Sequence, residues 1–205
     1  MEPSDIAVSY GHIARHWASD AFNHKNGIPQ HERAIAFLKH RGTALDIGCG
    51  CSGRFVQLLR EHGFVPEGVD ISKEMTELAQ ARAPEVVFHC ADICEWHFPK
   101  QYDFITAWDS IFHLSIERQE RVIAKVSAGL QDDGVFIFSA GGVDESDEHT
   151  DSFLGQNFFY GAIGIPGLLR LLHDCGLALR HFEFDQWPYN HLCVIVQKTG
   201  SGATP

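Results

Sequence analysis

The chain has 205 residues, of which 44% are hydrophobic and 21% are charged, a balance typical of a soluble globular protein. This length accommodates one well-buried domain and is too short for two domains of ordinary size. Sixteen Lys and Arg residues against 27 Asp and Glu residues give a net charge of −11 with the histidines neutral. A charge of this sign repels nucleic-acid phosphates and anionic lipids, so we expect neither nucleic acid nor a membrane surface as a partner.

We expect a cytoplasmic protein that holds neither disulfides nor a metal ion. No apolar run is long enough to cross a bilayer, and the first residues lack the basic start and apolar core of a signal peptide. The six cysteines form no Cys-x-x-Cys pair and lie mostly in apolar segments, where a reduced cysteine acts as a small core residue. A zinc site built from Cys90 and Cys94 with His89 or His97 is the alternative.

The first 40 residues carry two helical patterns. In the first pattern, apolar residues recur at three- and four-residue steps and predict a helix with one apolar face: Ile6, Tyr10, Ile13 and Trp17. The chain then breaks at 26–29, which contains Gly27 and Pro29, and a second helix is predicted over about 30–40.

From residue 42 onward, strand and helix patterns alternate. Short apolar runs predict strands at about 43–47, 64–69, 86–90, 102–107 and 135–139. Helical patterns lie between them at about 54–62, 72–83 and 116–129. This alternation predicts a doubly wound α/β sheet of parallel strands with helices on both faces.

The end of the chain changes this rhythm. The polar segment 140–165 is rich in acidic residues at its start and is predicted as a lid or acceptor loop, because long loops at the carboxyl end of a strand often cover a binding site. A helix at about 166–175 then leads into two β-like runs, 177–185 and 191–198. Strands joined by so short a turn must be antiparallel, so we expect a closing hairpin in a sheet of seven strands.

A glycine-rich turn follows the first predicted strand. The segment 44–53 runs from apolar residues through Asp46 into the pattern Gly48-x-Gly50-x-x-Gly53, after which a helix begins. Glycines allow a tight turn and let a ligand approach the backbone without meeting a Cβ atom. The pattern is shared with dinucleotide-binding sites and is a weak signal alone, so its meaning depends on the residues around it.

Three features of residues 43–198 together resemble the class I S-adenosylmethionine-dependent methyltransferases. The first is the segment Leu45–Gly50, in which an acidic residue directly precedes the glycine turn. The second is the segment Gly68–Ser72, with Asp70 at the tip of the second strand. The third is the closing antiparallel hairpin, which distinguishes this fold from ordinary dinucleotide-binding folds.

The resemblance implies one methyltransferase-like domain over residues 1–205 that uses S-adenosylmethionine and releases S-adenosylhomocysteine. Its expected parts are an N-terminal helical cap (1–41), a cofactor-binding core (42–139), the lid or acceptor loop, and a closing helix and hairpin (166–198). The residues that the resemblance assigns to the cofactor are Asp46, Gly48, Cys49, Gly50, Asp70, Ile71, Met75, Asp92, Ile93, Ala107 and Trp108.

The chemistry of these residues suits that cofactor. Asp70 lies 24 residues after Asp46, where a carboxylate can accept both ribose hydroxyls in the crevice at the strand ends. Asp46 is suited to the cofactor's ammonium group, directly or through water, and Asp92 resembles the residue that binds the adenine amino group. The structural alternatives are a helix-capping or solvated carboxylate at Asp70 and a tight turn without ligand at the glycines.

Residues expected near the methyl-transfer centre follow the fourth strand or belong to the cap and the late loop. His113 is the candidate catalytic base where the acceptor must lose a proton, and a buried histidine bonded to the backbone is the alternative. The candidate acceptor-pocket residues are Tyr10, His16, Trp17, Asp109, His149 and Tyr160. Weaker candidates flank the closing hairpin: His181, Asp185, Gln186 and His191.

The class of acceptor is narrowed by the tip of the fourth strand. The segment Ala107–Ser110 reads Ala-Trp-Asp-Ser and lacks the Asn/Asp-Pro-Pro-aromatic signature of nucleic-acid amino-methyltransferases. We therefore expect a small-molecule acceptor and a monomer or homodimer. The alternative functions are a catalytically silent S-adenosylmethionine-binding or regulatory protein, and an NAD-linked oxidoreductase, which shares the glycine pattern but usually brings further strands or a substrate domain.

Overall fold

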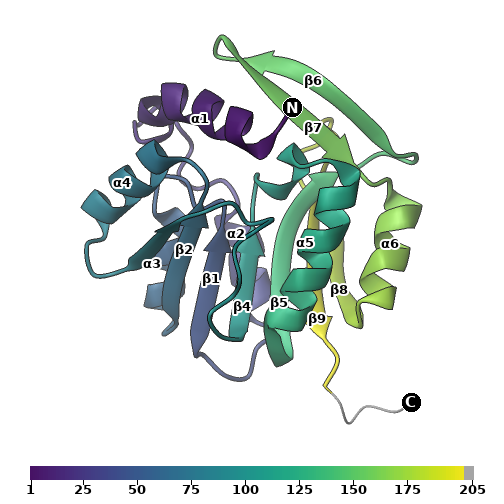
Figure 1. The fold of residues 1–205 in the computed structure, drawn as a ribbon. Helices are drawn as coiled ribbons and strands as arrows, with labels where there is room; N and C mark the ends of the chain where they lie inside the picture. The colour runs from purple at the N-terminus through teal and green to yellow at the C-terminus, as the bar shows by residue number, and fades with distance from the viewer. Residues whose placement is uncertain (201–205) are drawn as a thin grey trace.

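The structure is a computed structural model that describes residues 1–200, and one seven-stranded sheet forms its centre, in the order β3-β2-β1-β4-β5-β9-β8 (Figure 1). The strands are β1 (Thr43–Ile47), β2 (Val65–Asp70), β3 (Val87–Cys90), β4 (Tyr102–Ala107), β5 (Leu130–Gly141), β8 (Leu177–Phe184) and β9 (His191–Lys198). Strands β1 to β5 pair in parallel, whereas β9 is antiparallel to both β5 and β8. The predicted doubly wound, mostly parallel sheet with a closing hairpin is confirmed.

Helices cover both faces of this sheet. They are α1 (Pro3–Trp17), α2 (Ile28–Ile35), α3 (Arg54–Glu61), α4 (Lys73–Arg82), α5 (Ile116–Gly129) and α6 (Ile165–Asp174), with a short 3-10 helix η1 (Ile111–His113). Helices α2 and α3 bury their apolar residues in one cluster, and α5 and α6 bury theirs in another. Each face of the sheet is therefore closed by its own pair of helices.

The strands supply both clusters by alternation. On β5, Phe136 and Phe138 pack toward α5 and α6, whereas Val135 and Ile137 pack toward α2 and α3. All four are at most 1% exposed. Successive side chains of a strand point to opposite faces, so a central strand covered on both sides reads as a continuous apolar run.

The N-terminal segment differs from the expected cap. Helix α1 lies across the carboxyl ends of the parallel strands, but α2 packs against the sheet with Ala34 and Ile35 buried (Figure 1). Helix α2 also begins earlier than predicted, at Ile28, because Pro29 fits the first turn of a helix, where its missing N–H is not needed.

The prediction of a loop over residues 140–165 is wrong. Residues 147–162 form an antiparallel hairpin of β6 (Asp147–Phe153) and β7 (Gln156–Ala162). Every residue of β6 is exposed, so no buried face imposes the alternation that marks a strand in a sequence. The turn is Leu154-Gly155 with both φ angles positive, at 49° and 76°, a turn usually marked by Asn-Gly or Asp-Gly.

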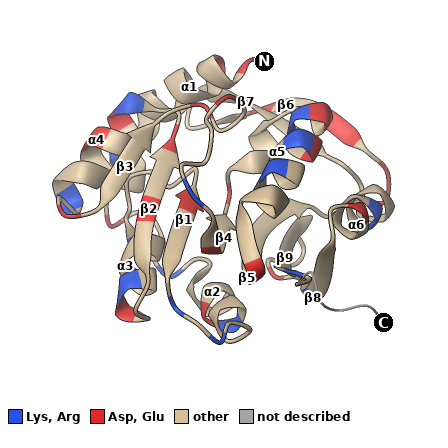
Figure 2. Cartoon of the chain, turned by 60° about the horizontal axis from the view of Figure 1, so that its bottom comes forward, with Lys and Arg blue, Asp and Glu red and all other residues tan. Residues whose placement is uncertain are grey.

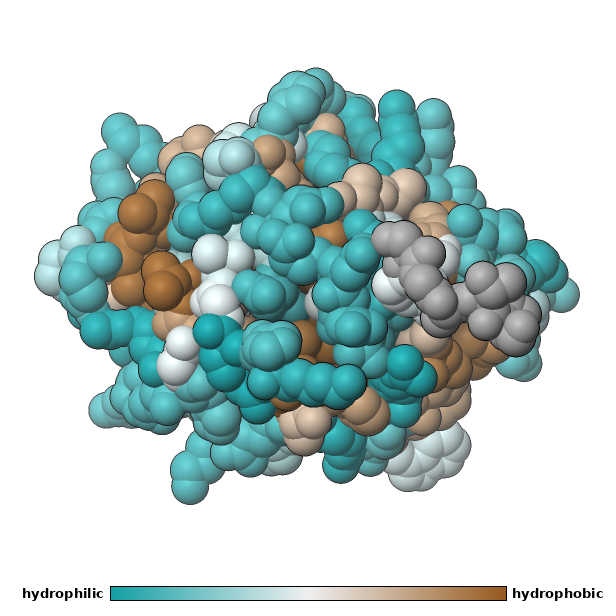
Figure 3. Space-filling model, turned by 90° about the horizontal axis from the view of Figure 1, so that it is seen from below, coloured by the Kyte–Doolittle hydropathy of each residue, from teal (hydrophilic) through white to brown (hydrophobic). Residues whose placement is uncertain are grey.

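The surface is largely polar both on the β6–β7 hairpin beside α1 and at the opposite end of the molecule. The hairpin β6–β7 carries acidic residues and no Lys or Arg (Figure 2). The face seen from below, at the amino ends of the parallel strands, is mostly hydrophilic with small separate hydrophobic patches (Figure 3). Within residues 1–200, no helix has the length and apolar character needed to span a membrane.

Candidate functional site

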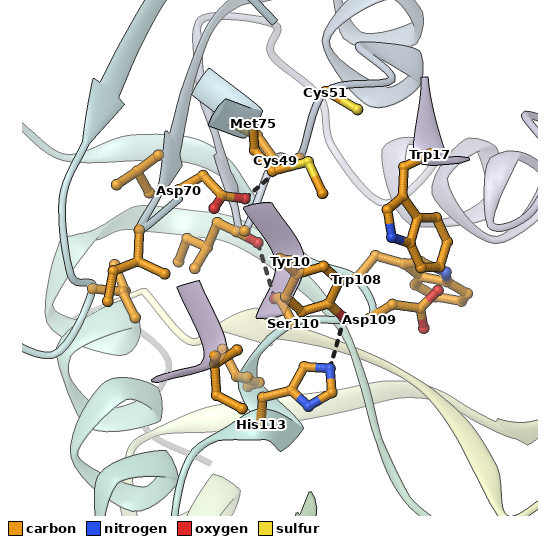
Figure 4. A pocket seen from close by; sticks show the side chains of 18 of the residues that line it. Tyr10, Trp17, Cys49, Cys51, Asp70, Met75, Trp108, Asp109, Ser110 and His113 are labelled. Atoms are coloured by element: carbon orange, nitrogen blue, oxygen red, sulfur yellow. Dashed lines mark hydrogen bonds between the residues drawn. The ribbon is translucent and has the colours of Figure 1, made fainter. Parts of the chain in front are cut away.

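A pocket opens at the carboxyl ends of β1, β2 and β4, beneath α1. It encloses about 1040 Å³ of space between protein atoms, including its open mouth. Asp70, Cys49 and Met75 lie on one side of this pocket and Trp17, Trp108 and Asp109 on the other, with Tyr10 and His113 between them (Figure 4). Ligands of open parallel sheets bind at this edge, outside the carboxyl ends of the strands.

The glycine turn forms the floor between β1 and α3. Gly48, Gly50 and Gly53 all have positive φ angles, at 68°, 55° and 66°. A Cβ at Gly48 would lie 2.3 Å from the Cβ of Ser110, so this position requires glycine. A Cβ at Gly50 would meet nothing within 4 Å, because this part of the turn faces the open pocket.

Asp70 is fixed to this turn by its carboxylate. Its Oδ2 accepts a hydrogen bond from the backbone N–H of Gly50 at 2.9 Å, and its Oδ1 accepts one from the N–H of Ser72 at 2.9 Å. Burial raises the pKa of Asp70, while these backbone donors lower it. Each oxygen keeps a further lone pair, and the residue lines the pocket, so Asp70 can accept hydrogen bonds from a ligand.

Nine of the residues predicted to bind a cofactor line the pocket: Gly48, Cys49, Gly50, Asp70, Ile71, Met75, Asp92, Ile93 and Trp108. The other two, Asp46 and Ala107, do not. Asp46 is 2% exposed behind the glycine turn, where burial raises its pKa to about 7, and Ala107 is fully buried in the core. Successive side chains of a strand point to opposite faces, so a residue at or near a strand tip can face the core instead of the pocket.

His113 joins three separate parts of the structure. Its Nδ1 donates to the carbonyl oxygen of Phe159 on β7 at 2.8 Å, so its Nε2 accepts from the hydroxyl of Tyr10 on α1 at 2.7 Å. Burial lowers the pKa of His113 to about 4, and the ring is therefore neutral at pH 7. The histidine lines the pocket and is also bonded to the backbone, so its catalytic role stays a prediction while the alternative of a backbone-bonded histidine describes its geometry.

The other predicted acceptor residues divide into two groups. Tyr10, Trp17 and Asp109 line the pocket. His16, His149 and Tyr160 do not, although Tyr160 packs against His113 with ring centroids 4.9 Å apart. His149 is exposed on β6, where it stacks on Tyr160 and bonds to Asp147.

Asp109 is held from several elements at the opposite end of the pocket from Asp70. Its Oδ1 accepts from Nε2 of His191 on β9 at 2.9 Å, and its Oδ2 accepts from the side-chain amide of Asn26 at 3.2 Å. His191 also bonds through Nδ1 to Asp185 at 2.6 Å. Burial lowers the pKa of His191, but the hydrogen bonds to Asp109 and Asp185 outweigh it and raise that pKa to about 9. At pH 7 His191 is therefore an imidazolium between two carboxylates.

Arg54 was not predicted as a site residue, yet it lines the pocket at the start of α3. Its Nε donates to the carbonyl oxygen of Asn26 and its Nη1 to Ser52, and its guanidinium lies over the rings of Phe22 and Phe55. A cation at a helix N-terminus opposes the helix dipole, and this unfavourable placement is the signal in the sequence that could have identified it.

The indole Nε1 atoms of Trp17 and Trp108 are buried, and neither has a hydrogen-bond partner in the described part of the chain. Both rings line the pocket. Buried donors without a partner are rare in proteins and are often explained by a bound ligand or water.

Among residues 1–200, no group of three or more His, Cys, Asp or Glu side chains is arranged to hold a metal ion.

Comparison with known proteins agrees with this geometry. Residues 44–134 match the family model described as a methyltransferase domain. Phosphoethanolamine N-methyltransferase of Plasmodium falciparum is 27% identical over 120 residues, which are 57% of this chain and 45% of that protein. Ubiquinone biosynthesis O-methyltransferase of Coxiella burnetii is 26% identical over 155 residues, which are 70% of this chain and 59% of that protein. The matches span about half the length of these curated relatives.

Solved structures extend the similarity over nearly the whole chain. Burkholderia thailandensis 1,6-didemethyltoxoflavin-N1-methyltransferase aligns with a TM-score of 0.72 at 22% identity, covering 96% of this chain and 87% of that one. An S-adenosylmethionine-dependent methyltransferase from Clostridium acetobutylicum aligns with a TM-score of 0.71 at 16% identity, covering 96% and 99%. In fold the chain is similar to S-adenosylmethionine-dependent methyltransferases, and the match to the methyltransferase domain family lies within this fold.

Proposed function

We propose that the protein transfers a methyl group from S-adenosylmethionine to a small-molecule acceptor and releases S-adenosylhomocysteine. The observation that carries this proposal is the pairing of Asp70 with the glycine turn, where a carboxylate and an open backbone position face the same pocket. The curated relatives are named for N-methylation and for O-methylation, so their names leave the acceptor atom open.

The residues along one wall of the pocket suit the successive parts of this cofactor. Asp70 would accept the ribose hydroxyls, Gly48 and Gly50 would receive the methionine part, and Asp92 and Ile93 would face the adenine. The fit is supported by Gly50, where a side chain would project into the pocket without meeting a protein atom. The bound cofactor would supply an activated methyl group on a sulfonium, and the protein's task is then to hold the nucleophile in line with it.

We propose that His113 is a positioning residue at the acceptor end, where it orients the Tyr10 hydroxyl and does not act as a free base. The neutral imidazole accepts the Tyr10 hydroxyl hydrogen, and both residues line the pocket. Replacing His113 with Gln, or Tyr10 with Phe, is expected to lower kcat by about a hundredfold because the acceptor is then held less precisely, while the dissociation constant of S-adenosylmethionine changes little. Unchanged turnover in both variants would assign the pair a structural role.

The function is tested by calorimetric titration with S-adenosylmethionine, S-adenosylhomocysteine and NAD, followed by a metabolite screen with a labelled methyl group. Tight binding of both sulfur compounds and transfer of label into a metabolite are expected. Saturable binding of NAD without any response to S-adenosylmethionine would contradict the proposal and favour an oxidoreductase. Binding of S-adenosylmethionine with no product from any metabolite would favour the catalytically silent alternative.

We further infer a cytoplasmic enzyme that acts on free metabolites rather than on nucleic acid or at a membrane surface, as a monomer or homodimer. Two observations support this inference. All six cysteines lie within the described residues and none is in a disulfide, which is usual in a reducing compartment. The net charge of −11 disfavours binding to nucleic acid and to anionic lipid.

A further inference from the structure

The carboxylate of Asp109 is built into the acceptor end of the pocket. Three segments that are distant in sequence donate hydrogen bonds to it, from Asn26 before α2, Ser139 on β5 and His191 on β9. Its side chain nevertheless stays 31% exposed and lines the pocket. A carboxylate that is fixed by the fold and still open to the pocket is suited to bind a hydrogen-bond donor there.

The backbone of Asp109 also has an uncommon conformation. Its φ angle is 52°, a left-handed conformation that residues with a side chain adopt at a cost, and its N–H donates to the hydroxyl of Ser139 at 2.7 Å. Such residues cluster at functional sites, where the surrounding structure holds them in place. In Figure 4, Asp109 lies on the same side of the pocket as Trp108 and Trp17.

Aromatic rings surround the same end of the pocket. Trp17 and Trp108 lie on the same side of the pocket as Asp109, and Tyr10 lies at its centre (Figure 4). Aromatic faces attract cations, and tryptophan does so most strongly. The nearby Arg54 guanidinium lies over the rings of Phe22 and Phe55 and is already bonded to the loop before α2.

We propose that the methyl acceptor is an amine whose nitrogen donates an N–H hydrogen bond to Asp109, an inference that rests on the proposed function. The neutral amine attacks with its lone pair, the N–C bond forms, and the C–S bond breaks with its electron pair moving to sulfur. The nitrogen becomes positively charged and then releases a proton to water. Since that charge grows in the transition state, a fixed carboxylate beside the nitrogen stabilises it.

The histidine of the pocket favours an amine over a hydroxyl acceptor. A hydroxyl must lose its proton before or during transfer and needs a free base. Both ring nitrogens of His113 are occupied, one by the carbonyl of Phe159 and the other by the hydroxyl of Tyr10. A neutral amine needs no base before it attacks.

His191 is the positioning residue of this arrangement. It bridges Asp109 and Asp185, with its side chain only 14% exposed, and so fixes the direction of the Asp109 carboxylate. Its own atoms contact Asp109 and Asp185, and it is not among the residues that line the pocket.

The first test follows a labelled methyl group from S-adenosylmethionine into a metabolite extract, with products separated on a cation exchanger and identified by mass spectrometry. Label in N-methylated amines is expected. Label only in methyl ethers, esters, thioethers or C-methylated products would overturn the amine inference and leave the proposed function standing. No label in any product, despite binding of S-adenosylmethionine, would contradict the proposed function and with it this inference.

The second test uses variants with the amine found in the first. Asp109→Asn is expected to lower kcat/KM by about 10- to 100-fold, the loss expected for one charge-assisted hydrogen bond, while S-adenosylmethionine still binds. His191→Gln is expected to raise KM for the amine more than it lowers kcat, and it serves as the second variant if Asp109→Asn does not fold. Asp174→Asn, at the exposed end of α6, is the control for loss of one negative charge. A kcat/KM within twofold of the wild type in Asp109→Asn would overturn the inference.

Discussion

Asp70 illustrates how one side chain can shape a site and also belong to it. It links the end of β2 to the glycine turn after β1 through the N–H of Gly50, and it caps the turn toward α4 through the N–H of Ser72. Ser72 in turn accepts a hydrogen bond from the N–H of Met75 as the N-cap of α4. The helix-capping interpretation and the ligand-binding interpretation of this carboxylate are therefore compatible.

Replacing Asp70 with Asn tests this double role. One oxygen becomes an NH₂ group that faces a backbone N–H, so one of the two hydrogen bonds is lost and a buried donor is left without a partner. We expect the free energy of unfolding to fall by about 1–3 kcal/mol and the affinity for S-adenosylmethionine to fall by about 10- to 100-fold.

Denaturant titration and calorimetry measure the two effects of Asp70→Asn separately. Asp20→Asn, at an exposed position after α1, is the control that changes charge alone. Loss of stability with unchanged affinity for S-adenosylmethionine would leave Asp70 with the capping role only.

Among the elements, α1 and the β6–β7 hairpin form a roof over the pocket that lies outside the two large clusters of the sheet. They share a small cluster around Ile6, Ile13 and Phe158, separate from the two large clusters on the sheet. Hydrogen bonds from Ser9 to the carbonyl of Asn157 and between His12 and Gln156 join the two at exposed positions. Segments with few buried contacts open at low free energy.

We predict that ligand binding protects this roof from hydrogen exchange. Amides of α1 and β7 should exchange faster than those of β4 and β5 in the free protein and slow markedly when S-adenosylhomocysteine is added, because α1 residues line the pocket. Mass spectrometry of peptic peptides with and without the compound measures this. Equal protection of α1 before and after binding would show that the roof does not respond to the cofactor.

A second element-level feature is the loop after β3 that carries Asp92 and Ile93. The ammonium group of Lys125 on α5 donates to three carbonyl oxygens of this loop, those of Ile93, Cys94 and Trp96, at 2.7, 2.8 and 3.1 Å. One side chain from a neighbouring helix therefore fixes the shape of the loop that we propose to face the adenine.

Lys125→Met is expected to weaken binding of adenosine-containing ligands. The variant leaves three partly buried carbonyls without their donor, so we expect a loss of about 1–3 kcal/mol in unfolding free energy and a several-fold rise in the dissociation constant of S-adenosylhomocysteine. Thermal unfolding and calorimetry provide the measurements, with Lys39→Met, exposed after α2, as the matched control. An affinity for S-adenosylhomocysteine equal to that of the control would show that Lys125 has no part in ligand binding.

Across the whole molecule, buried histidines couple stability to pH in opposite directions. Burial lowers the pKa of His113 to about 4, so between pH 6.5 and 4 the unfolded chain binds a proton that the folded protein does not. The stability that neutral, buried His113 contributes to the folded protein is lost as the pH falls through this range. For His191, whose pKa is raised to about 9, the folded protein holds the extra proton, so its contribution is full below pH 6.5 and is lost as the pH rises through 9.

Two single variants separate these effects. The stability difference between wild type and His191→Gln should shrink by up to roughly 3 kcal/mol from pH 6.5 to 9, and that between wild type and His113→Gln should shrink by a similar amount from pH 6.5 to 4. Denaturant unfolding across pH 4–9 provides the data. Parallel profiles for all three proteins would mean that neither histidine changes its proton affinity on folding.

The amino-acid sequence alone was enough to predict the central sheet and one wall of the pocket, because both depend on local patterns. Continuous apolar runs mark strands that are covered on both faces, and the glycines between β1 and α3 mark positive φ angles that are needed whatever the rest of the chain does. Nine of the eleven residues that the resemblance assigned to the cofactor line the pocket.

The contacts within the proposed acceptor wall depend on the tertiary structure alone. Tyr10 and His113 are 103 residues apart, and Asp109 and His191 are 82 residues apart, and each pair meets only because α1 folds over the sheet and β9 pairs with β5. The β6–β7 hairpin also escaped prediction, because its exposed strand has no buried face to leave a pattern in the sequence. Local residue patterns encode backbone conformation and burial, whereas a binding site assembled from distant segments depends on contacts that exist only once the chain has folded.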